Sequence, residues 1–124
     1  MADTALATAE RTLPHNLEAE RSVLGAILVH IDAFNLAAQV VDSQDFYRDA
    51  HRRIFDRMVA LNERHDAIDF VTLKEELARA GELDEVGGPA YVAGLADGVP
   101  RATNVEYYAR IVKEKSTLRN LIYA

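Results

Sequence analysis

The chain has 124 residues, with 14 Lys and Arg against 20 Asp and Glu, a net charge of −6 and no cysteine. Hydrophobic residues make up 49% and charged residues 27%, a balance that indicates one folded globular domain and excludes a disordered chain. The lack of cysteine excludes disulfides, thiolate zinc sites and cysteine nucleophiles. No run approaches the ~20 apolar residues of a membrane span, and residues 1–12 do not resemble a signal peptide, so we expect a cytoplasmic location.

Apolar residues recur at helical spacing along almost the whole chain, which predicts an all-α fold. The first helix is expected to follow Asn16 as its N-cap and to carry an apolar face formed by Leu17, Leu24, Ile27, Leu28 and Ile31. Gly25 lies inside this helix, where glycine costs about 1 kcal/mol relative to alanine, and it therefore indicates a close helix contact. A short second helix is expected after Asp32, with a buried face of Phe34, Ala37, Val40 and Val41. Residues 42–45 end it.

The next two helices show clear apolar stripes. The third stripe consists of Ile54, Phe55, Met58 and Leu61, and the fourth of Phe70, Leu73, Leu77 and Ala80. The fourth helix has two possible starts, because either Asp69 is its N-cap or Thr72 and Glu75 form a capping box. Gly81 is expected to end it in the left-handed conformation.

Two further helices complete the pattern. Gly87–Pro89 opens a short helix that carries Tyr91, Val92 and Leu95, and the capping-box sequence Thr103–Glu106 opens a long one. The long pattern has no stop signal at its end, so we expect the chain to be a fragment that finishes within a helix. The sequence thus predicts a compact bundle of about six helices, with a flexible segment at 1–12, a globular head at 13–100 and a projecting, truncated C-terminal helix at 101–124.

The sequence shows no catalytic, cofactor-binding or metal-binding constellation. The Gly87–Gly88 turn lacks the Lys-Ser/Thr pair of a phosphate loop, and the four histidines do not stand at metal-ligand spacing. The adjacent carboxylates Glu75–Glu76 and Asp84–Glu85 cannot form a working acid–base pair, since helix neighbours point about 100° apart. We therefore expect the chain itself to be no enzyme and to hold no cofactor.

Two charged clusters and one apolar stripe favour binding. The region 48–64 holds five arginines, and a strip of Arg52, Arg53 and Arg57 contacts either phosphate groups or, as we favour, carboxylates such as Asp49. The cluster of Lys113, Lys115 and Arg119 allows the same two interpretations, and salt bridges between subunits as a third. The apolar stripe of the last helix predicts a self-association surface, unless downstream chain covers it; it consists of Tyr108, Ile111, Val112, Leu118, Leu121 and Ile122.

Several strings in the chain are similar to one known family in both order and spacing. They are Leu13–Ala26, Asp45–Arg48 with His51, Ile54 and Phe55, Asp69–Leu73, Glu85–Tyr91, Asn104–Val112 and Glu114–Ser116. Together they resemble the N-terminal domain of the DnaB-type bacterial replicative DNA helicases.

The resemblance implies a part of a ring-shaped hexamer that unwinds DNA at the replication fork. In that family an ATPase motor, which uses ATP and Mg²⁺ and contacts DNA, lies in a C-terminal half with no counterpart here. The resembling domain packs as a trimer of dimers and recruits primase, and a helicase loader is a further expected partner. By resemblance, the primase-docking surface includes Glu18 and Tyr91, and the helix that starts near Thr103 is the first arm of a hairpin that pairs with a neighbour.

Two other interpretations remain open from the sequence. One is a helical nucleic-acid-binding module that uses the Arg52/Arg53/Arg57 strip. The other is a helicase-binding domain from the partner side, such as the small helical C-terminal region of a primase.

Overall fold

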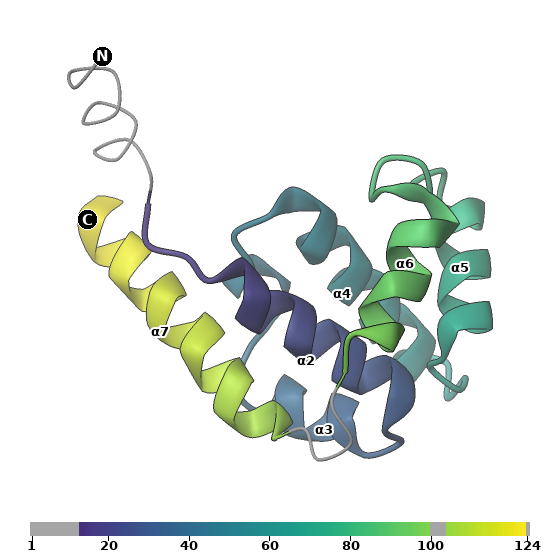
Figure 1. Cartoon of the computed structure of the whole chain (residues 1–124), viewed down its shortest axis with the longest axis horizontal. Helices are drawn as coiled ribbons and strands as arrows, with labels where there is room; N and C mark the ends of the chain where they lie inside the picture. The colour runs from purple at the N-terminus through teal and green to yellow at the C-terminus, as the bar shows by residue number, and fades with distance from the viewer. Residues whose placement is uncertain (1–12, 100–103, 124) are drawn as a thin grey trace.

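The computed structural model describes residues 13–99 and 104–123, which form six α-helices and one short 3₁₀ helix, with no strand among them (Figure 1). The elements in chain order are α2 (Leu17–Val29), α3 (Ala33–Ala38), η1 (Ser43–Asp45), α4 (Asp49–Glu63), α5 (Phe70–Arg79), α6 (Gly88–Asp97) and α7 (Val105–Tyr123). The all-α fold class and the number of helices expected from the sequence are confirmed. The segment 1–12, expected to be flexible, lies outside the described residues.

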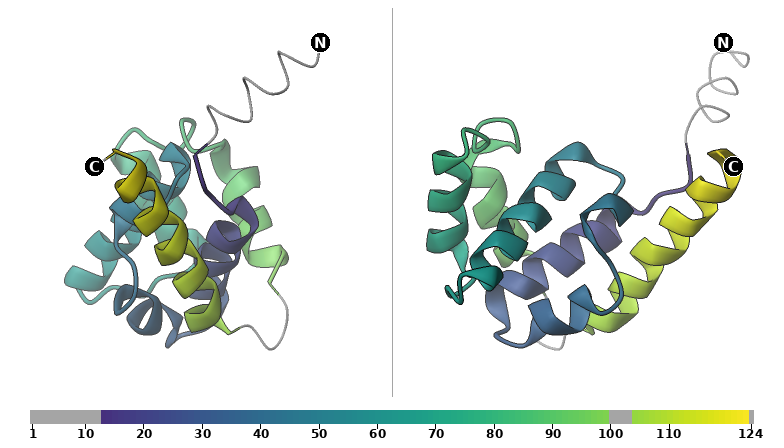
Figure 2. Two further views of the ribbon diagram at one scale, coloured as in Figure 1. Left: turned by 90° about the vertical axis from the view of Figure 1, so that its left-hand side faces the viewer. Right: turned by 180° about the vertical axis from the view of Figure 1, so that it is seen from behind.

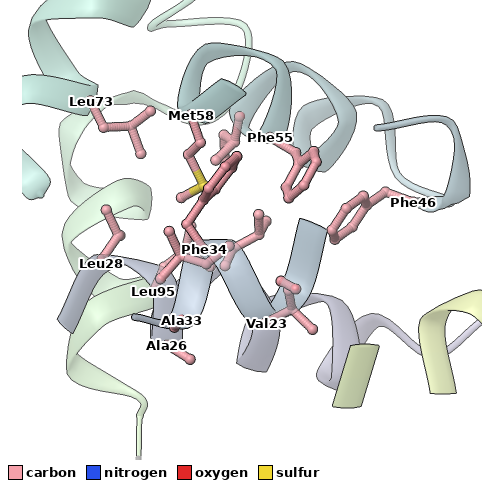
Figure 3. Packing of buried hydrophobic residues seen from close by; sticks show 14 of the residues in the cluster. Val23, Ala26, Leu28, Ala33, Phe34, Phe46, Phe55, Met58, Leu73 and Leu95 are labelled. Atoms are coloured by element: carbon pink, nitrogen blue, oxygen red, sulfur yellow. The ribbon is translucent and has the colours of Figure 1, made fainter. Parts of the chain in front are cut away.

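Helix α2 occupies the centre of the bundle and packs against α3, α4, α6 and α7 (Figures 1 and 2). Helix α7 runs alongside α2 in the opposite direction, while α5 lies on the far side, against α4 and α6. Side chains from all these helices meet in one core, in which the ring of Phe55 of α4 lies close to those of Phe34 of α3 and Phe46 (Figure 3). A continuous apolar core of this kind is what the helical spacing of the apolar residues predicts.

Helix α2 begins as expected and ends earlier than expected. The side chain of Asn16 accepts a hydrogen bond from the backbone N–H of Ala19 at 2.9 Å, which is the predicted N-cap. The helix ends at Val29, however, and Ile31 is 96% exposed instead of joining its apolar face. Asp32 stands at the N-cap position of α3 without a side-chain capping bond.

The break at 42–45 is itself an ordered element, which the sequence analysis missed. Asp42 accepts a hydrogen bond from the backbone N–H of Gln44, and Asp45 accepts one from the backbone N–H of Asp42, both at 2.9 Å. These reciprocal bonds form a capping box around the single turn η1. Asp45 is buried in the process.

Of the two possible starts of α5, the structure has the one with Asp69 as the N-cap. Its side chain accepts from the backbone N–H of Thr72, and the Thr72 hydroxyl accepts in return from the backbone N–H of Asp69. Gly81 ends the helix with a φ of 74°, as expected, and the next N–H reaches back to the carbonyl of Leu77 at 2.9 Å. Ala80, expected on the buried face, is exposed.

Helix α7 is part of the head over most of its length. Asn104 caps its first turn by accepting from the backbone N–H of Tyr107 at 3.0 Å, whereas Thr103 lies outside the described residues. The buried residues of α7 are Val105, Ala109, Val112, Ser116 and Arg119. The C-terminal turns of α7 extend past the start of α2 (Figure 1). The last residues of the helix, 120–123, are all exposed.

Candidate functional site

A groove of about 410 Å³ lies between α2 and α6 and is also lined by one residue of α7; we call it the docking groove. Its lining residues are Glu18, Arg21, Ser22, Ala90, Tyr91, Gly94, Leu95, Gly98 and Tyr108. Glu18 and Tyr91, which are 73 positions apart in the printed sequence and were both singled out as candidates, therefore line the same hollow.

The groove owes its walls to a close approach of two helices at Gly25. A Cβ atom at this position would overlap the backbone carbonyl oxygen of Leu95 and the Cγ2 atom of Val99. Only glycine lets α2 and α6 come this near, so the close contact expected from Gly25 is confirmed. On the α6 side, Gly94 and Gly98 add no side chains, which leaves the hollow open between the two helices.

The groove combines an apolar interior with charges at its rim. Leu95 is buried and Tyr91 is half-buried, while Glu18 and Arg21 are exposed one helical turn apart on α2. An aromatic ring with a polar rim of both charge signs is the composition of a protein-binding surface.

A buried polar chain holds Tyr91 from behind. Its hydroxyl lies 2.6 Å from Nε2 of His51, and Nδ1 of His51 lies 2.7 Å from Oε1 of Glu20. Glu20 and His51 are 1% and 0% exposed, respectively. The other carboxylate oxygen of Glu20 accepts a hydrogen bond from the backbone N–H of Tyr47 at 2.7 Å. This series of hydrogen bonds therefore extends to the turn before α4.

Sequence reasoning missed the role of these two residues, although a signal was present. Glu20 stands at helical spacing from Val23 and Leu24, and His51 at helical spacing from Ile54 and Phe55. Each is thus a polar residue on an apolar stripe that had been recognised. Because buried polar groups are almost always paired, two such residues on two stripes indicate a mutual bond.

Tyr91 also borders a second hollow on its other side. This hollow, of about 350 Å³, is lined by Arg48, Asp49, Ala50, Asp84, Glu85, Val86, Gly87 and Tyr91. The guanidinium carbon of Arg48 lies 5.4 Å from the centre of the Tyr91 ring, a cation–π distance. Tyr91 is therefore shared by the two hollows.

The arginine strip pairs with carboxylates and carbonyls of its own chain. Arg53 forms ion pairs with Asp49, Glu82 and Glu85, and Arg57 forms ion pairs with Glu76 and Glu82. Arg52 donates to the carbonyls of Phe46 and Tyr47 at 3.1 and 2.8 Å. These contacts support the pairing interpretation over phosphate binding.

The pairing also affects the titration of two carboxyl groups. A hydrogen bond from Arg64 holds the pKa of Glu76 below its ordinary value, and a hydrogen bond from Arg53 does the same for the pKa of Asp49. We call the set of Arg53, Arg57, Arg64, Glu76 and Glu82 the arginine network.

The C-terminal basic cluster attaches α7 to the head. Lys113 lies 3.3 Å from the carboxylate of Asp45, and the Ser116 hydroxyl donates to the same group at 2.7 Å. Arg119 donates to the carbonyl oxygens of Pro14 and Asp45 at 2.9 and 2.7 Å. Lys113 and Arg119 therefore have partners within the chain.

The six candidates for self-association divide into two groups. Val112 is buried within the chain, and Tyr108 and Ile111 are half-buried against its core, so these three pack on the chain's own core. Tyr108 also lines the docking groove. Val112 is thereby corrected from a surface candidate to a core residue. The exposed candidates are Leu118 at 38%, Leu121 at 68% and Ile122 at 59%, followed by Tyr123 at 77%.

Over residues 13–99 and 104–123, no group of three or more histidine and carboxylate side chains is placed to hold a metal ion. Within the same ranges, no helix combines the length and apolar character needed to cross a membrane.

Comparison with known proteins places these features in a family. The model of the DnaB-like helicase N-terminal domain matches residues 12–114. The replicative DNA helicase DnaC of Bacillus subtilis is 48% identical over 113 residues, and the replicative DNA helicase DnaB of Geobacillus stearothermophilus is 49% identical over the same number. In both cases the match covers 91% of this chain and 25% of the relative, so the chain spans a quarter of their length.

A solved structure agrees with this match. The crystal structure of the N-terminal domain of DnaB helicase from Mycobacterium tuberculosis is similar with a TM-score of 0.87 and 41% identity, over 90% of this chain and 81% of that one. The relatives are helicases, and this argues against the alternative interpretation of the sequence as a helicase-binding domain of a primase. The chain belongs to the family of DnaB-like helicase N-terminal domains.

Proposed function

We propose that this chain is the assembly and primase-recruitment domain of a hexameric replicative helicase that unwinds DNA at the replication fork. Its family membership supports this, since the similar proteins are named replicative DNA helicases. The chain corresponds to a quarter of their length, and the proposal assigns ATP, Mg²⁺ and DNA contact to the remainder. In this proposal the domain acts through protein contacts alone, and a helicase loader is a further partner of the whole protein.

The observation that carries the recruitment part is the meeting of Glu18 and Tyr91 in the docking groove. Glu18 presents a carboxylate at the rim, and Tyr91 presents an aromatic ring inside it. Aromatic residues in desolvated hollows are the usual anchors of protein interfaces, and a rim charge contributes orientation more than affinity. A helical segment of the primase with an apolar side chain for the groove and a basic group for Glu18 fits this arrangement.

The assembly part rests on the end of α7. Leu118, Leu121 and Ile122 leave an apolar stripe exposed near the C-terminal end of α7. Exposed stripes of this kind mark contact surfaces. We assign this stripe to pairing with a helix of a neighbouring subunit, as the hairpin arm of the family implies.

A calorimetric titration tests recruitment. The protein is titrated with the C-terminal domain of the primase from the same organism, alongside Tyr91→Ala and Glu18→Ala. We expect saturable heat for the unaltered protein, a loss of about tenfold or more in affinity for Tyr91→Ala, and a smaller loss for Glu18→Ala.

The matched control is Tyr107→Ala, because Tyr107 is 54% exposed on α7 and does not line the groove. Its affinity is expected to equal that of the unaltered protein. If Tyr91→Ala binds as tightly as this control, the groove is not the primase site and the recruitment proposal is wrong.

A further inference from the structure

In the buried polar chain behind Tyr91, the chemistry of Glu20 determines which group donates and which accepts each hydrogen bond. Its carboxylate accepts from the backbone N–H groups of Tyr47, at 2.7 Å, and Arg48, at 3.4 Å, through different oxygens. An ionised carboxylate only accepts hydrogen bonds, so a ring nitrogen in contact with it is the donor. Nδ1 of His51, 2.7 Å from Oε1 of Glu20, must therefore carry the hydrogen of that contact.

The tautomer of His51 then determines what Tyr91 does with its hydroxyl. A neutral imidazole with its hydrogen on Nδ1 leaves a bare lone pair on Nε2. To this lone pair the Tyr91 hydroxyl, 2.6 Å away, can only donate, whereas an imidazolium would carry a hydrogen on Nε2 and donate to Tyr91 instead. We take the neutral ring, and the first experiment below tests this choice. The bond that Tyr91 donates uses the one proton of the phenol, so none remains for a partner in the groove.

The same bond fixes the position of the ring. His51 is fully buried in α4, and Tyr91 reaches it from α6 across the start of α4. Tyr91 lines both recesses, and the guanidinium of Arg48 lies over the face of its ring. Without the bond to His51, the ring could rotate about χ1 towards either recess.

We infer that Glu20 and His51 are positioning residues for docking: Glu20 holds His51, and His51 accepts the hydrogen bond of the Tyr91 hydroxyl from inside the protein. A partner therefore meets the Tyr91 ring in a fixed position, and the phenol has no proton left to donate to it. This inference rests on the proposed function, since it specifies how that same groove recognises its partner. At this point of the groove, the partner is expected to place apolar groups or hydrogen-bond donors. It is not expected to place an acceptor that needs the proton of the Tyr91 hydroxyl.

The first experiment reads the tautomer directly in the unbound protein. Nitrogen-15 NMR of the histidine rings near neutral pH is expected to show His51 with a protonated Nδ1 and a bare Nε2. Tyr91→Phe, which deletes only the hydroxyl, is expected to shift the Nε2 resonance, while Tyr107→Phe leaves it unchanged. A hydrogen on Nε2 of His51, alone or together with one on Nδ1, overturns the inference.

The second experiment is a double-mutant cycle on primase binding. His51→Gln is expected to weaken binding about threefold or more in the unaltered protein and to have no effect in the Tyr91→Phe background, because it acts through the hydroxyl. Equal weakening in both backgrounds indicates a general loss of structure and overturns the inference. If His51→Gln fails to fold, Tyr91→Phe alone decides, since it must weaken binding relative to Tyr107→Phe.

The outcomes separate this inference from the proposed function. If Tyr91→Ala weakens binding while Tyr91→Phe and His51→Gln bind like the unaltered protein, the groove is the site and only the positioning role is wrong. If Tyr91→Ala has no effect, the proposed function fails and the inference fails with it.

Discussion

Helix α4 makes polar contacts on two sides, and the two sides differ in kind. On the side of α2 and α6 it contributes His51, which is completely buried and joins Glu20 to Tyr91. On the side of α5 it contributes Arg53 and Arg57, whose side chains are 35% and 30% exposed in the arginine network. One side therefore has a short series of buried hydrogen bonds, and the other has a set of partly exposed ion pairs.

The difference shows which polar residues hold neighbouring side chains in a fixed position. A bond in a dry interior is strong and costly to leave incomplete, so the buried chain holds its members in one arrangement. Ion pairs at a wet surface contribute little and are screened by salt. The basic strip, which is the more conspicuous feature of the sequence, therefore neutralises neighbouring acids, while the inconspicuous buried pair supports the docking groove.

The largest expected effect comes from breaking the buried chain. Glu20→Ala leaves His51 and the backbone N–H of Tyr47 without their acceptor, and we expect a loss of about 3 kcal/mol in the free energy of unfolding. Urea denaturation measures it, with Glu18→Ala on the exposed face of the same helix as the control. A loss below about 1 kcal/mol for Glu20→Ala contradicts the importance given to this chain.

The next effect concerns the helix contact that shapes the groove. Gly25→Ala forces α2 and α6 apart, because the added Cβ overlaps the backbone at Leu95, and we expect a loss of about 2 kcal/mol. Gly94→Ala is the matched control, since a Cβ there meets nothing within 4 Å and gains helix propensity of about 0.5–1 kcal/mol. Thermal unfolding should move the two variants in opposite directions. A shift of both in the same direction contradicts the close contact.

A smaller effect is expected at the most buried residue of the arginine network. Glu76→Gln weakens the contacts with Arg57, Arg64 and Arg79 at a cost of about 1 kcal/mol, discounted for the exposure of these arginines.

Because the folded-state pKa of Glu76 lies below its ordinary value of 4.5, its contribution is complete above that pH and is lost as pH falls through the lowered pKa. Urea denaturation of both proteins at a series of acidic pH values should show their difference shrinking. A difference that stays constant down to the acid transition would exclude this linkage.

The smallest effect belongs to the exposed ion pairs. Arg53→Ala should change stability less than Glu76→Gln, and high salt should remove most of the remaining difference, since two of the three partners of Arg53, Asp49 and Glu85, are exposed. The unaltered protein should also show no salt-sensitive binding to single-stranded DNA in fluorescence anisotropy. Binding that falls steeply with salt and is lost in Arg53→Ala would restore the nucleic-acid interpretation.

Local signals in the sequence predicted most of the fold. Asn16 has a side chain that caps a helix start, and Gly81 has a backbone that adopts the left-handed conformation of a helix end. Both lie at the positions that these properties predict. Gly25 predicted a close contact because a glycine inside a helix needs a reason to be there. Ile31 was placed wrongly because the apolar spacing continues past the point where α2 ends at Val29.

The features that were missed depend on contacts between distant residues. The turn at 43–45 is stabilised by reciprocal bonds of Asp42 and Asp45, and Asp45 also binds Ser116 from the other end of the chain. Likewise, the meeting of Glu18 and Tyr91 needs the crossing of α2 and α6, which no local pattern gives. Helical spacing predicts which face of a helix is buried and does not predict which helix will cover it.

The central claim is that the partner binds on the side of α2 and α6 and not on the side of the arginine network. Nitrogen-15 NMR of the labelled chain, titrated with the primase C-terminal domain, tests this directly. We expect the amide signals of Ser22, Tyr91, Gly94 and Gly98 to move and those of Arg57 and Glu76 to stay. Shifts confined to the arginine network, with the groove signals unchanged, would contradict the account.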